Sequence, residues 1–410
     1  MRILVLNMGS SSLKSCLYNL TEPLPQTPPA PSWEAHMEWE EPFKNVRLRA
    51  KRAGRRVVDE QLNIQSQRVA TEHALHTLWQ GPAHVLDDPA EVDMVGHRVV
   101  HGGEQYSAPT VVTPEVKQAI ARLSVFAPEH NPAEVEGIET AEQIFKSQPH
   151  VAVFDTAFHR RMPEYAAIYP GPYAWFERGI RRYGFHGISH QYCAARTAEI
   201  IGRELASLRL VTCHLGHGCS LAAVRDGRSV DTTMGFTPLE GLMMGSRCGT
   251  IDPGILIHLL REEGYSADRL DELLNRESGL LGVSGVSDDM RQILSAIENG
   301  NSRARLAFDT FIHRLRQHIG AMIASLGGLD ALAFTAGIGE NSPQVRAEAC
   351  KGFEFLHLKL DQQKNAQSPV DRDIAQPDSA VRVVVVAARE DWAIAQECWK
   401  LARSGQAPGS

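Results

Sequence analysis

The chain begins with a short apolar run that passes directly into a polar turn. Ile3 to Leu6 predict a buried strand, the stretch from Asn7 to Ser12 carries a glycine and three serines, and Lys14 precedes a second apolar run. Backbone and hydroxyl donors together with a cation stabilise a compact anion, so this turn suits a phosphate group. The alternative is an ordinary N-terminal hairpin with a serine-rich turn.

Residues 210–224 repeat this plan. A β-rich run leads into a turn with Gly216, Gly218 and donor side chains, an apolar run returns, and residues 225–228 close a further hairpin. Two phosphate-type hairpins in two halves of one chain favour a duplicated architecture that faces a shared cleft.

The size, charge and cysteines of the chain narrow its class. A length of 410 residues is too great for one ordinary core, so two domains are expected. The net charge of −7 argues against general nucleic-acid binding, because phosphate backbones need a basic surface. The seven cysteines are irregularly spaced and predict reduced thiols in a cytoplasmic protein. We expect neither a signal peptide nor a membrane span, because the apolar runs are too short.

Two predicted buried strands carry or precede a charged side chain. The run 92–103 contains Arg98, which is either part of an internal salt bridge or an anion clamp at the strand end, where α/β sheets bind ligands. The run 151–154 is followed by Asp155, which could be a base, part of a metal shell or a helix cap.

Three further segments carry candidate ligand groups. His186 and His190 lie four apart at a predicted helix start, a spacing that can bind zinc, although we favour His186 as a donor to an anion over zinc or a purely structural pair. A glycine-punctuated loop holds Arg247. Residues 337–341 are expected to form a loop, in which Gly337 and Gly339 would let a flat ligand approach the backbone. A lone Gly-x-Gly is only a weak dinucleotide signal.

The remaining elements follow from periodicity and punctuation. Hydrophobic spacing predicts helices over 67–80, 131–145, 255–261, 304–326 and 392–402, and strands over 331–335 and 381–386. The five prolines of 21–31 predict an exposed loop, and the charged stretch 38–56 predicts a solvated strand pair.

Taken in order, these motifs resemble the acetate kinase (acetokinase) family of the acetate and sugar kinase/Hsp70/actin superfamily. The resemblance rests on the stretch 7–14, the segment around His186 and His190, His-Leu-Gly-x-Gly at 214–218 and Gly-Ile-Gly-Glu-Asn at 337–341. It implies an α/β fold of two duplicated RNase H-like (actin-like ATPase) domains, each a mixed β-sheet flanked by helices, with the cleft between them. The implied domains are 1–157 with the helix 392–410, and 158–391 with the nucleotide pocket. A homodimer without nucleic-acid or membrane partners is also implied.

The resemblance implies a role for each motif. The metal-site residues are Asn7 and Glu390, the acyl-phosphate group comprises Arg98, His130, Asp155, His186 and Arg247, and the acyl pocket comprises Val100, Glu129, Phe185 and Pro238. The phosphate contacts are Ser10, Ser12, Lys14, His214, Leu215, Gly216, His217 and Gly218. The adenosine pocket comprises Asp289, Met290, Arg291, Gly337, Ile338, Gly339, Glu340 and Asn341.

The implied reaction is direct in-line transfer of the ATP γ-phosphoryl group to acetate, giving acetyl phosphate and ADP, with Mg²⁺ (or Mn²⁺) as the metal. Two arginines would hold the two anions, and His186 would donate to the equatorial oxygens of the transferring group. The acetate carboxylate is already ionised, so Asp155 would organise metal-bound water or arginine instead of abstracting a proton.

Three positions depart from the family pattern. His217 replaces the usual Asn, residues 387–389 read Ala-Ala-Arg in place of Pro-Thr-Asn, and Glu129 replaces the usual Leu of the acyl pocket. A propionate or butyrate kinase of the same family is therefore the nearest alternative. A sugar-kinase-like or Hsp70-like ATPase would lack the Arg98, Arg247 and His186 segments, and a non-catalytic relative would not be expected to keep Asn7 and Glu390.

Overall fold

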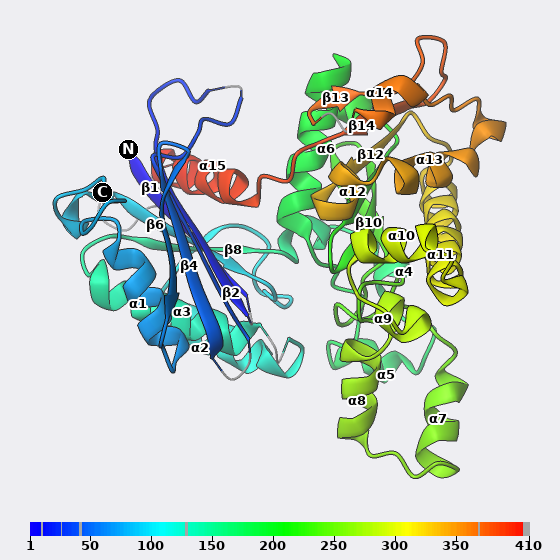
Figure 1. Cartoon of the computed structure of the whole chain (residues 1–410), viewed down its shortest axis with the longest axis horizontal. Coiled ribbons are helices and arrows are strands. Elements are labelled where there is room, and N and C mark those ends of the chain that lie inside the picture. Colours follow the sequence, from blue (N-terminus) through cyan, green and yellow to red (C-terminus); the bar gives the residue numbers. More distant parts are fainter. Residues whose placement is uncertain (10, 26, 41–42, 128–129, 368–369, 405–410) are drawn as a thin grey trace. The chain divides into compact units, whose positions relative to one another are not determined.

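The chain divides into two compact units. The computed structural model describes residues 1–9, 11–25, 27–40, 43–127, 130–367 and 370–404 (Figure 1). Unit 1 contains Met1–Ala157 and the C-terminal segment from Arg389, and unit 2 contains Phe158–Ala388. The sequence had placed residues 389–391 in the second domain. They belong to unit 1 because Glu390 and Asp391 form the first turn of a helix that packs on the sheet of unit 1.

Unit 1 is built on a mixed sheet whose described strands follow the order β5-β4-β3-β2-β1-β6-β8-β7. β1 pairs parallel with β6, β6 pairs parallel with β8, and the other neighbours are antiparallel. The strands are β1 (Arg2–Met8), β2 (Ser12–Asn19), β3 (Trp33–Glu40), β4 (Lys44–Arg52), β5 (Arg55–Leu62), β6 (Met94–Val99), β7 (Thr110–Val111) and β8 (His150–Phe154).

Helices cover both faces of this sheet. They are α1 (Gln67–His76), α2 (Pro114–Arg122), α3 (Asn131–Ile144) and α15 (Glu390–Arg403), with 3₁₀ turns at Pro89–Glu91, Leu123–Val125 and Ala157–His159. Leu4, Leu6 and Met8 join a core cluster with side chains of α1 and α3. The opposite face meets α15, drawn red in Figure 1, so closely that a Cβ at Gly96 would lie 2.7 Å from Cys398 Sγ. Strand alternation therefore turns Asn7 and Arg98 towards the side of α15.

Unit 2 is built on a second mixed sheet of order β11-β10-β9-β12-β14-β13. β12 pairs parallel with β9 and with β14, and the remaining pairs are antiparallel. The strands are β9 (Leu210–Leu215), β10 (Cys219–Arg225), β11 (Arg228–Thr232), β12 (Ala331–Thr335), β13 (Arg372–Asp373) and β14 (Arg382–Val385).

The helices of unit 2 include α6 on one face of this sheet and the long α11 on β10 and β11. Side chains of α6 share a core cluster with Leu210, Ala222 and Val224, so the even-numbered positions of β9 and β10 face α6. The helices are α4 (Glu164–Ala167), α5 (Tyr173–Glu177), α6 (Gly187–Ile201), α7 (Pro253–Arg261), α8 (Ala267–Arg276), α9 (Gly279–Ser284), α10 (Met290–Glu298), α11 (Ser302–Leu326), α12 (Ala336–Asn341), α13 (Pro343–Lys351) and α14 (Gln362–Ala366), with 3₁₀ turns at Leu205–Ser207 and Glu354–Leu356.

The two sheets repeat one arrangement. In unit 1 the run β3-β2-β1-β6-β8 has the same order and the same strand directions as β11-β10-β9-β12-β14 in unit 2. The hairpin β1–β2 thus corresponds to β9–β10, which confirms the predicted duplication and the mixed α/β class.

Most predicted elements are present, with one correction. The helices expected over 67–80, 131–145, 255–261, 304–326 and 392–402 correspond to α1, α3, α7, α11 and α15, and the charged stretch 38–56 lies in the meander β3-β4-β5. The residues 337–341 were expected to form a loop, but they lie in helix α12. Among the described residues, no helix combines the length and the apolar character that a bilayer crossing needs.

Candidate active site

The first group of predicted site residues gathers at the carboxyl ends of the parallel strands of unit 1. Asn7 lies near the end of β1, Arg98 lies near the end of β6, and Glu390 begins α15. Asn7 Nδ2 donates to Glu390 Oε2 at 3.2 Å, and Arg98 Nη1 donates to Asn7 Oδ1 at 3.5 Å. The guanidinium also lies 3.9 Å from Glu390 Oε2, so these three side chains form one connected polar cluster.

Arg98 and Asp155 form a buried ion pair. Asp155 follows β8 directly, and its Oδ2 accepts a hydrogen bond from Arg98 Nη2 at 2.5 Å. The Arg98 side chain is 13% exposed and that of Asp155 only 1%. Burial disfavours the guanidinium, but Asp155, Glu390 and Glu134 together hold the pKa of Arg98 above its ordinary value. The salt bridge considered for Arg98 is therefore present, and it lies at the strand edge where a ligand clamp was expected.

A second buried carboxyl, which the sequence did not single out, supports this cluster. Glu134 lies in the first turn of α3, and its Oε2 accepts a hydrogen bond from the Val100 amide at 3.0 Å. The residue is 2% exposed, and burial raises the pKa of its carboxyl to about 8. It thus anchors the backbone of a predicted acyl-pocket residue. A glutamate in the first turn of a helix is usually exposed to solvent, where it interacts favourably with the helix dipole. The sequence therefore gives no signal that Glu134 is buried.

The other predicted residues of unit 1 surround the first hairpin and α3. Lys14 is exposed and lies directly opposite Asn7 in the β1–β2 register, so both side chains share one face of the sheet. The Gly9 amide donates to the Ser12 carbonyl at 2.8 Å and closes the turn. His130 precedes α3 and is half-buried. The predicted residues Ser10 and Glu129 lie outside the described residues.

The second group of predicted site residues lies where α6 meets the β9–β10 hairpin in unit 2. His186 is the residue before the first turn of α6 and lies in the left-handed region, with φ 56° and ψ 25°, a conformation that few non-glycine residues adopt. Its Nδ1 lies 2.9 Å from Ser220 Oγ, and its ring stacks on that of His214 with centroids 4.1 Å apart. The backbone and both neighbours therefore fix the direction of the imidazole.

Gly218, in the predicted phosphate turn, brings His186 and Arg247 to one place. A Cβ built on Gly218 would lie 3.6 Å from His186 Nε2 and 3.7 Å from Arg247 Nη1. Arg247 Nη1 also donates to the Pro238 carbonyl at 3.4 Å, and the side chain of Phe185 next to His186 is buried. The backbone of the turn, a guanidinium and an imidazole thus converge on one small volume, as an oxyanion requires.

The rest of the 214–218 turn is held by a side-chain contact, a buried side chain and a backbone hydrogen bond. His214 Nδ1 lies 2.8 Å from Ser189 Oγ, Leu215 is fully buried, and the Gly216 amide donates to the Gly218 carbonyl at 3.1 Å. His217, which replaces the usual Asn, is 61% exposed, and its Nε2 lies 3.0 Å from Asp288 Oδ2.

Residues 337–341 are ordered by contacts that the sequence did not predict. The fully buried Arg346 donates from Nη1 to the carbonyls of Gly339 and Glu340, both at 2.8 Å. Glu340 Oε1 accepts from the Ala388 amide at 2.9 Å, so this predicted nucleotide residue contacts the unusual 387–389 segment. A Cβ on Gly337 would meet nothing within 4 Å, which leaves its backbone open to a ligand.

Asp289, Met290 and Arg291 begin α10. Asp289 caps the helix by accepting from the Arg291 amide at 2.8 Å, and it pairs with the Arg291 guanidinium at 2.6 Å. Met290 is buried, whereas Arg291 is 88% exposed. The Arg291 side chain is therefore accessible at the start of α10. Met290 is instead part of the core.

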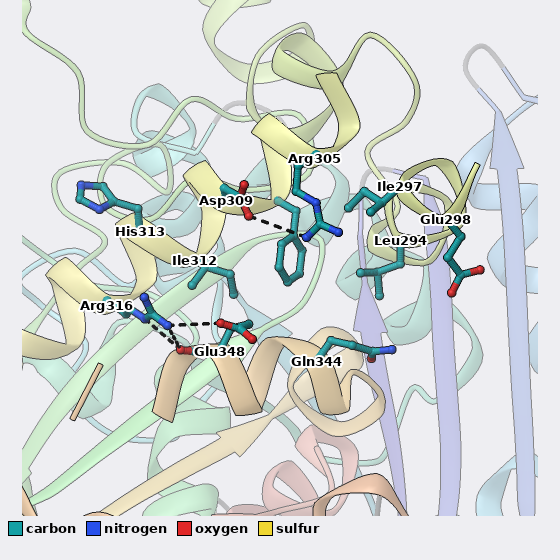
Figure 2. Close-up of a pocket in the computed structure, with 11 residues that line it drawn as sticks. Leu294, Ile297, Glu298, Arg305, Asp309, Ile312, His313, Arg316, Gln344 and Glu348 are labelled. Carbon is teal, nitrogen blue, oxygen red and sulfur yellow. Dashed lines mark hydrogen bonds and ion pairs between the residues drawn. The ribbon is translucent and has the colours of Figure 1, made fainter. Parts of the chain in front are cut away.

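A cavity of about 530 Å³ lies elsewhere in unit 2, between α10, α11 and α13 (Figure 2). Figure 2 shows Arg305, Asp309 and Arg316 on α11, with Arg316 turned to Glu348 on α13. No predicted site residue is among the described residues that line it, which are Leu294, Ile297, Glu298, Arg305, Phe308, Asp309, Ile312, His313, Arg316, Gln344 and Glu348.

Comparison with known proteins shows which family the chain belongs to. The model of the acetokinase family matches residues 2–396. The chain belongs to the acetokinase family. A relative from Cyanothece sp. called acetate kinase is 59% identical over 98% of both chains. This confirms the family indicated by the sequence motifs.

Solved structures of acetokinase-family members share the fold. The crystal structure of Porphyromonas gingivalis acetate kinase has a TM-score of 0.88 with 38% identity, covering 98% of this chain and 99% of that one. A propionate kinase from Francisella tularensis has a TM-score of 0.87 with 37% identity, covering 97% and 98%. The predicted fold of two mixed sheets flanked by helices is therefore confirmed.

Sequence reasoning missed the hydroxyl residues that hold the histidines of this acetokinase-family site. Ser220 contacts His186, and Thr212 contacts His190. A usable signal existed, because Thr212 and His214 are two residues apart on a strand and Ser220 pairs with His214 across the hairpin, so all three share the face that meets α6. His190 is fully buried and satisfies its ring nitrogens with hydroxyl groups, as a core histidine does.

Proposed function

We propose that this protein transfers the γ-phosphoryl group of ATP to acetate, reversibly, to form acetyl phosphate and ADP. The observation that carries the proposal is the convergence of His186 Nε2 and Arg247 Nη1 on Gly218 in a chain of the acetokinase family. The relatives named acetate kinase, 57–59% identical over 98% of the chain, support acetate as the acceptor.

For this phosphoryl transfer the protein needs mainly to position the two substrates and to stabilise the negative charge of the transition state. A carboxylate oxygen of acetate attacks the γ-phosphorus, a new P–O bond forms, and the bond to the bridging oxygen breaks, so that ADP leaves with the electron pair. The acetate carboxylate is ionised at neutral pH, so no base is required. Arg98 and Arg247 would neutralise the two anions, and His186 would donate to the equatorial oxygens, where transition-state charge lies.

A divalent metal fits the cluster around Asn7 and Glu390. With Glu134 protonated, the carboxylates of Asp155 and Glu390 face a single guanidinium, which leaves one negative charge for a cation. Among the described residues, no group of three or more His, Cys, Asp or Glu could hold a metal alone. This fits Mg²⁺ or Mn²⁺, which keep water ligands and bind together with substrate phosphates. Bound there, the metal would neutralise phosphate charge, with Asn7 and Glu390 holding it partly through water.

We further propose that the two units bind different parts of the substrates. Unit 2 would hold the nucleotide, with the 214–218 turn at the phosphates and with the start of α10 and the exposed backbone of Gly337 at the adenosine. Unit 1 would hold the metal, with Lys14 and the first hairpin as a second phosphate contact. For the acyl group we propose Val100 as a contact residue of unit 1, and Phe185 and Pro238 as contact residues of unit 2.

Trapping acetyl phosphate as its hydroxamate tests the proposal. With MgATP we expect kcat/KM to be highest for acetate and lower for propionate and butyrate, and a clear preference for propionate would assign the protein to the alternative function. His186→Ala should lower kcat by roughly 10²–10³, far more than it raises the KM for ATP. An unchanged kcat would refute the role of His186.

We also propose a homodimer in the cytoplasm. Helix α7 exposes Ile255, Ile257 and Leu260 by 47%, 49% and 45% and buries none of its residues, so an apolar partner surface would stabilise it. All seven cysteines are within the described residues and none forms a disulfide, which suits a reducing compartment. Light scattering of the purified protein and of Ile257→Asp should show a dimer and a monomer. A monomeric parent protein would refute the dimer.

A further inference from the structure

A continuous chain of hydrogen bonds runs from the middle of β9 to His186. Thr212 Oγ1 lies 2.7 Å from His190 Nδ1, and His190 Nε2 lies 2.7 Å from Ser220 Oγ. Ser220 Oγ in turn lies 2.9 Å from His186 Nδ1. We call these four side chains the histidine relay. It joins two strands and one helix of unit 2 within a single connected unit.

The histidine relay is shielded from water except at its last member. Thr212, His190 and Ser220 are fully buried, whereas His186 is half-buried at the start of α6. Burial, together with the neighbouring rings of His159 and His214, lowers the pKa of His190 well below its ordinary value. His190 is therefore neutral, with a hydrogen on one ring nitrogen and a lone pair on the other.

Each hydrogen bond of the relay has one donor and one acceptor, and neutral His190 has only one N–H group. The hydrogen bonds can therefore all point outward, towards His186, or all point inward, towards Thr212. In the outward direction, Thr212 donates to His190 Nδ1, His190 Nε2 donates to Ser220, and Ser220 donates to His186 Nδ1. A neutral His186 then carries its hydrogen on Nε2, the nitrogen nearest Gly218. In the inward direction every bond reverses, His186 carries its hydrogen on Nδ1, and Nε2 donates only when the ring is protonated.

The contacts at the two ends decide between these directions. The inward direction adds only a bond from Thr212 Oγ1 to the Ala222 carbonyl at 3.5 Å, which is close to the limit for any hydrogen bond. The outward direction adds a bond from His186 Nε2 to a phosphoryl oxygen, and a charged acceptor makes such a bond about twice as strong as a neutral one. An anion beside Gly218 therefore selects the outward direction.

We propose that Thr212, His190 and Ser220 are positioning residues that hold neutral His186 in its Nε2–H tautomer, so that it donates to the transferring phosphoryl group without first being protonated. This inference rests on the proposed function. Among the described residues, the titratable or charged groups beside the ring include His214, which stacks on it from β9, and Arg247 at Gly218. Arg247 disfavours a protonated His186, which makes a neutral donor useful there.

Ser220→Ala removes the hydroxyl that joins the two histidines. Above about pH 7.5, where a histidine of ordinary pKa is neutral, we expect kcat to fall roughly 5- to 30-fold, the effect of one hydrogen bond on a transition state. At a pH low enough to protonate His186, the ring donates from Nε2 regardless of Ser220, so the deficit should shrink there to about threefold or less. Thr212→Val should show a smaller deficit with the same pH dependence, and Thr212→Ser should restore activity.

Ser229→Ala is the matched control. Ser229 is equally buried, and its Oγ lies 2.8 Å from Nδ1 of the buried His159, outside the relay. Its pH profile should follow that of the parent protein. Proton–nitrogen NMR of ¹⁵N-histidine-labelled protein with a non-hydrolysable ATP analogue reports the tautomer directly, with His186→Asn and His190→Asn to assign the signals. We expect a hydrogen on Nε2 of both rings.

Three results would overturn the relay. They are a hydrogen on Nδ1 of His186 in the loaded protein, a Ser220→Ala deficit that is the same whether the His186 ring is protonated or neutral, as NMR reports it, and a parent kcat that falls as the ring loses its proton. An enzyme without acetate kinase activity would instead refute the proposed function, while the tautomer measurement would still report on the relay.

Discussion

Gly218→Ala separates the catalytic role of the phosphate turn from its structural role. The new Cβ would lie 3.5 Å from His186 Cε1, 3.6 Å from His186 Nε2 and 3.7 Å from Arg247 Nη1, which are ordinary van der Waals contacts. The backbone of Gly218 is not left-handed, so alanine fits without strain. The loss of glycine entropy in the unfolded chain should leave stability unchanged or raise it by up to about 1 kcal/mol.

The same methyl group would occupy the place where a phosphoryl oxygen approaches both donors. Each hydrogen bond to a charged group contributes roughly 1.5–3 kcal/mol, so the loss of two predicts a fall of about 10²–10⁴ in kcat/KM. Hydroxamate assays with acetate and MgATP measure this fall, and thermal unfolding measures stability. Gly320→Ala, in the middle of α11 where a Cβ meets nothing within 4 Å, is the control that should keep full activity. A Gly218→Ala enzyme that melts normally and keeps activity within threefold would refute the placement of the phosphoryl group.

Three other substitutions test the charged groups. Burial raises the folded pKa of Glu134 from 4.5 to about 8, so its contribution to stability is full below about pH 4.5 and is lost as the pH rises towards 8. Glu134→Gln should therefore gain unfolding free energy relative to the parent protein as the pH rises from 5 to 8, by at most roughly 5 kcal/mol measured by urea unfolding, whereas a constant difference would contradict the raised pKa. Asp155→Ala leaves Arg98 buried without its ion-pair partner and should lower the urea-unfolding free energy by about 3 kcal/mol, with Asp155→Asn losing less; equal stability of all three proteins would mean that the pair is solvated. His217→Asn breaks an exposed pair, so its melting temperature should stay within about 2 °C of that of the parent protein, and a larger change in thermal unfolding would contradict the small contribution of this pair.

The fold could be predicted from sequence where the chain repeats itself or alternates. The likeness of the first hairpin to residues 210–224 predicted the duplication, and the two sheets show it strand by strand. The alternation of side chains along β1 and β6 also places Asn7 and Arg98 on one face, since parallel strands end at the same edge. Local patterns were sufficient here because each conclusion needed only the strand period and one pairing.

Other features could not be predicted because contacts that no local pattern reveals produce them. Glycine disfavours helix, so residues 337–341 indicated a loop, yet the buried guanidinium of Arg346 binds the carbonyls of Gly339 and Glu340 and stabilises α12. Glu134 is buried only because α3 packs over the end of β6. The Val100 amide is 34 residues from Glu134, outside any local pattern, whereas Arg346 is only six or seven residues from the carbonyls that it binds, but nothing in the local sequence marks its guanidinium as buried.

The duplicated sheets carry different chemistry at equivalent positions, and we expect this difference to let one scaffold serve two substrates. The ends of β1, β6 and β8 carry an amide, a guanidinium and a carboxylate, groups whose charges could balance those of a metal ion and an anion. The face of β9 and β10 instead carries hydroxyl and imidazole groups, which are neutral when buried and can be ordered by direction. The charged cluster of unit 1 could accommodate ligands of different charge. The neutral histidine relay of unit 2 would instead direct a single N–H group, that of His186 Nε2, at one position. The first suits a metal and a carboxylate, and the second suits the oxygens of a phosphoryl group in transfer.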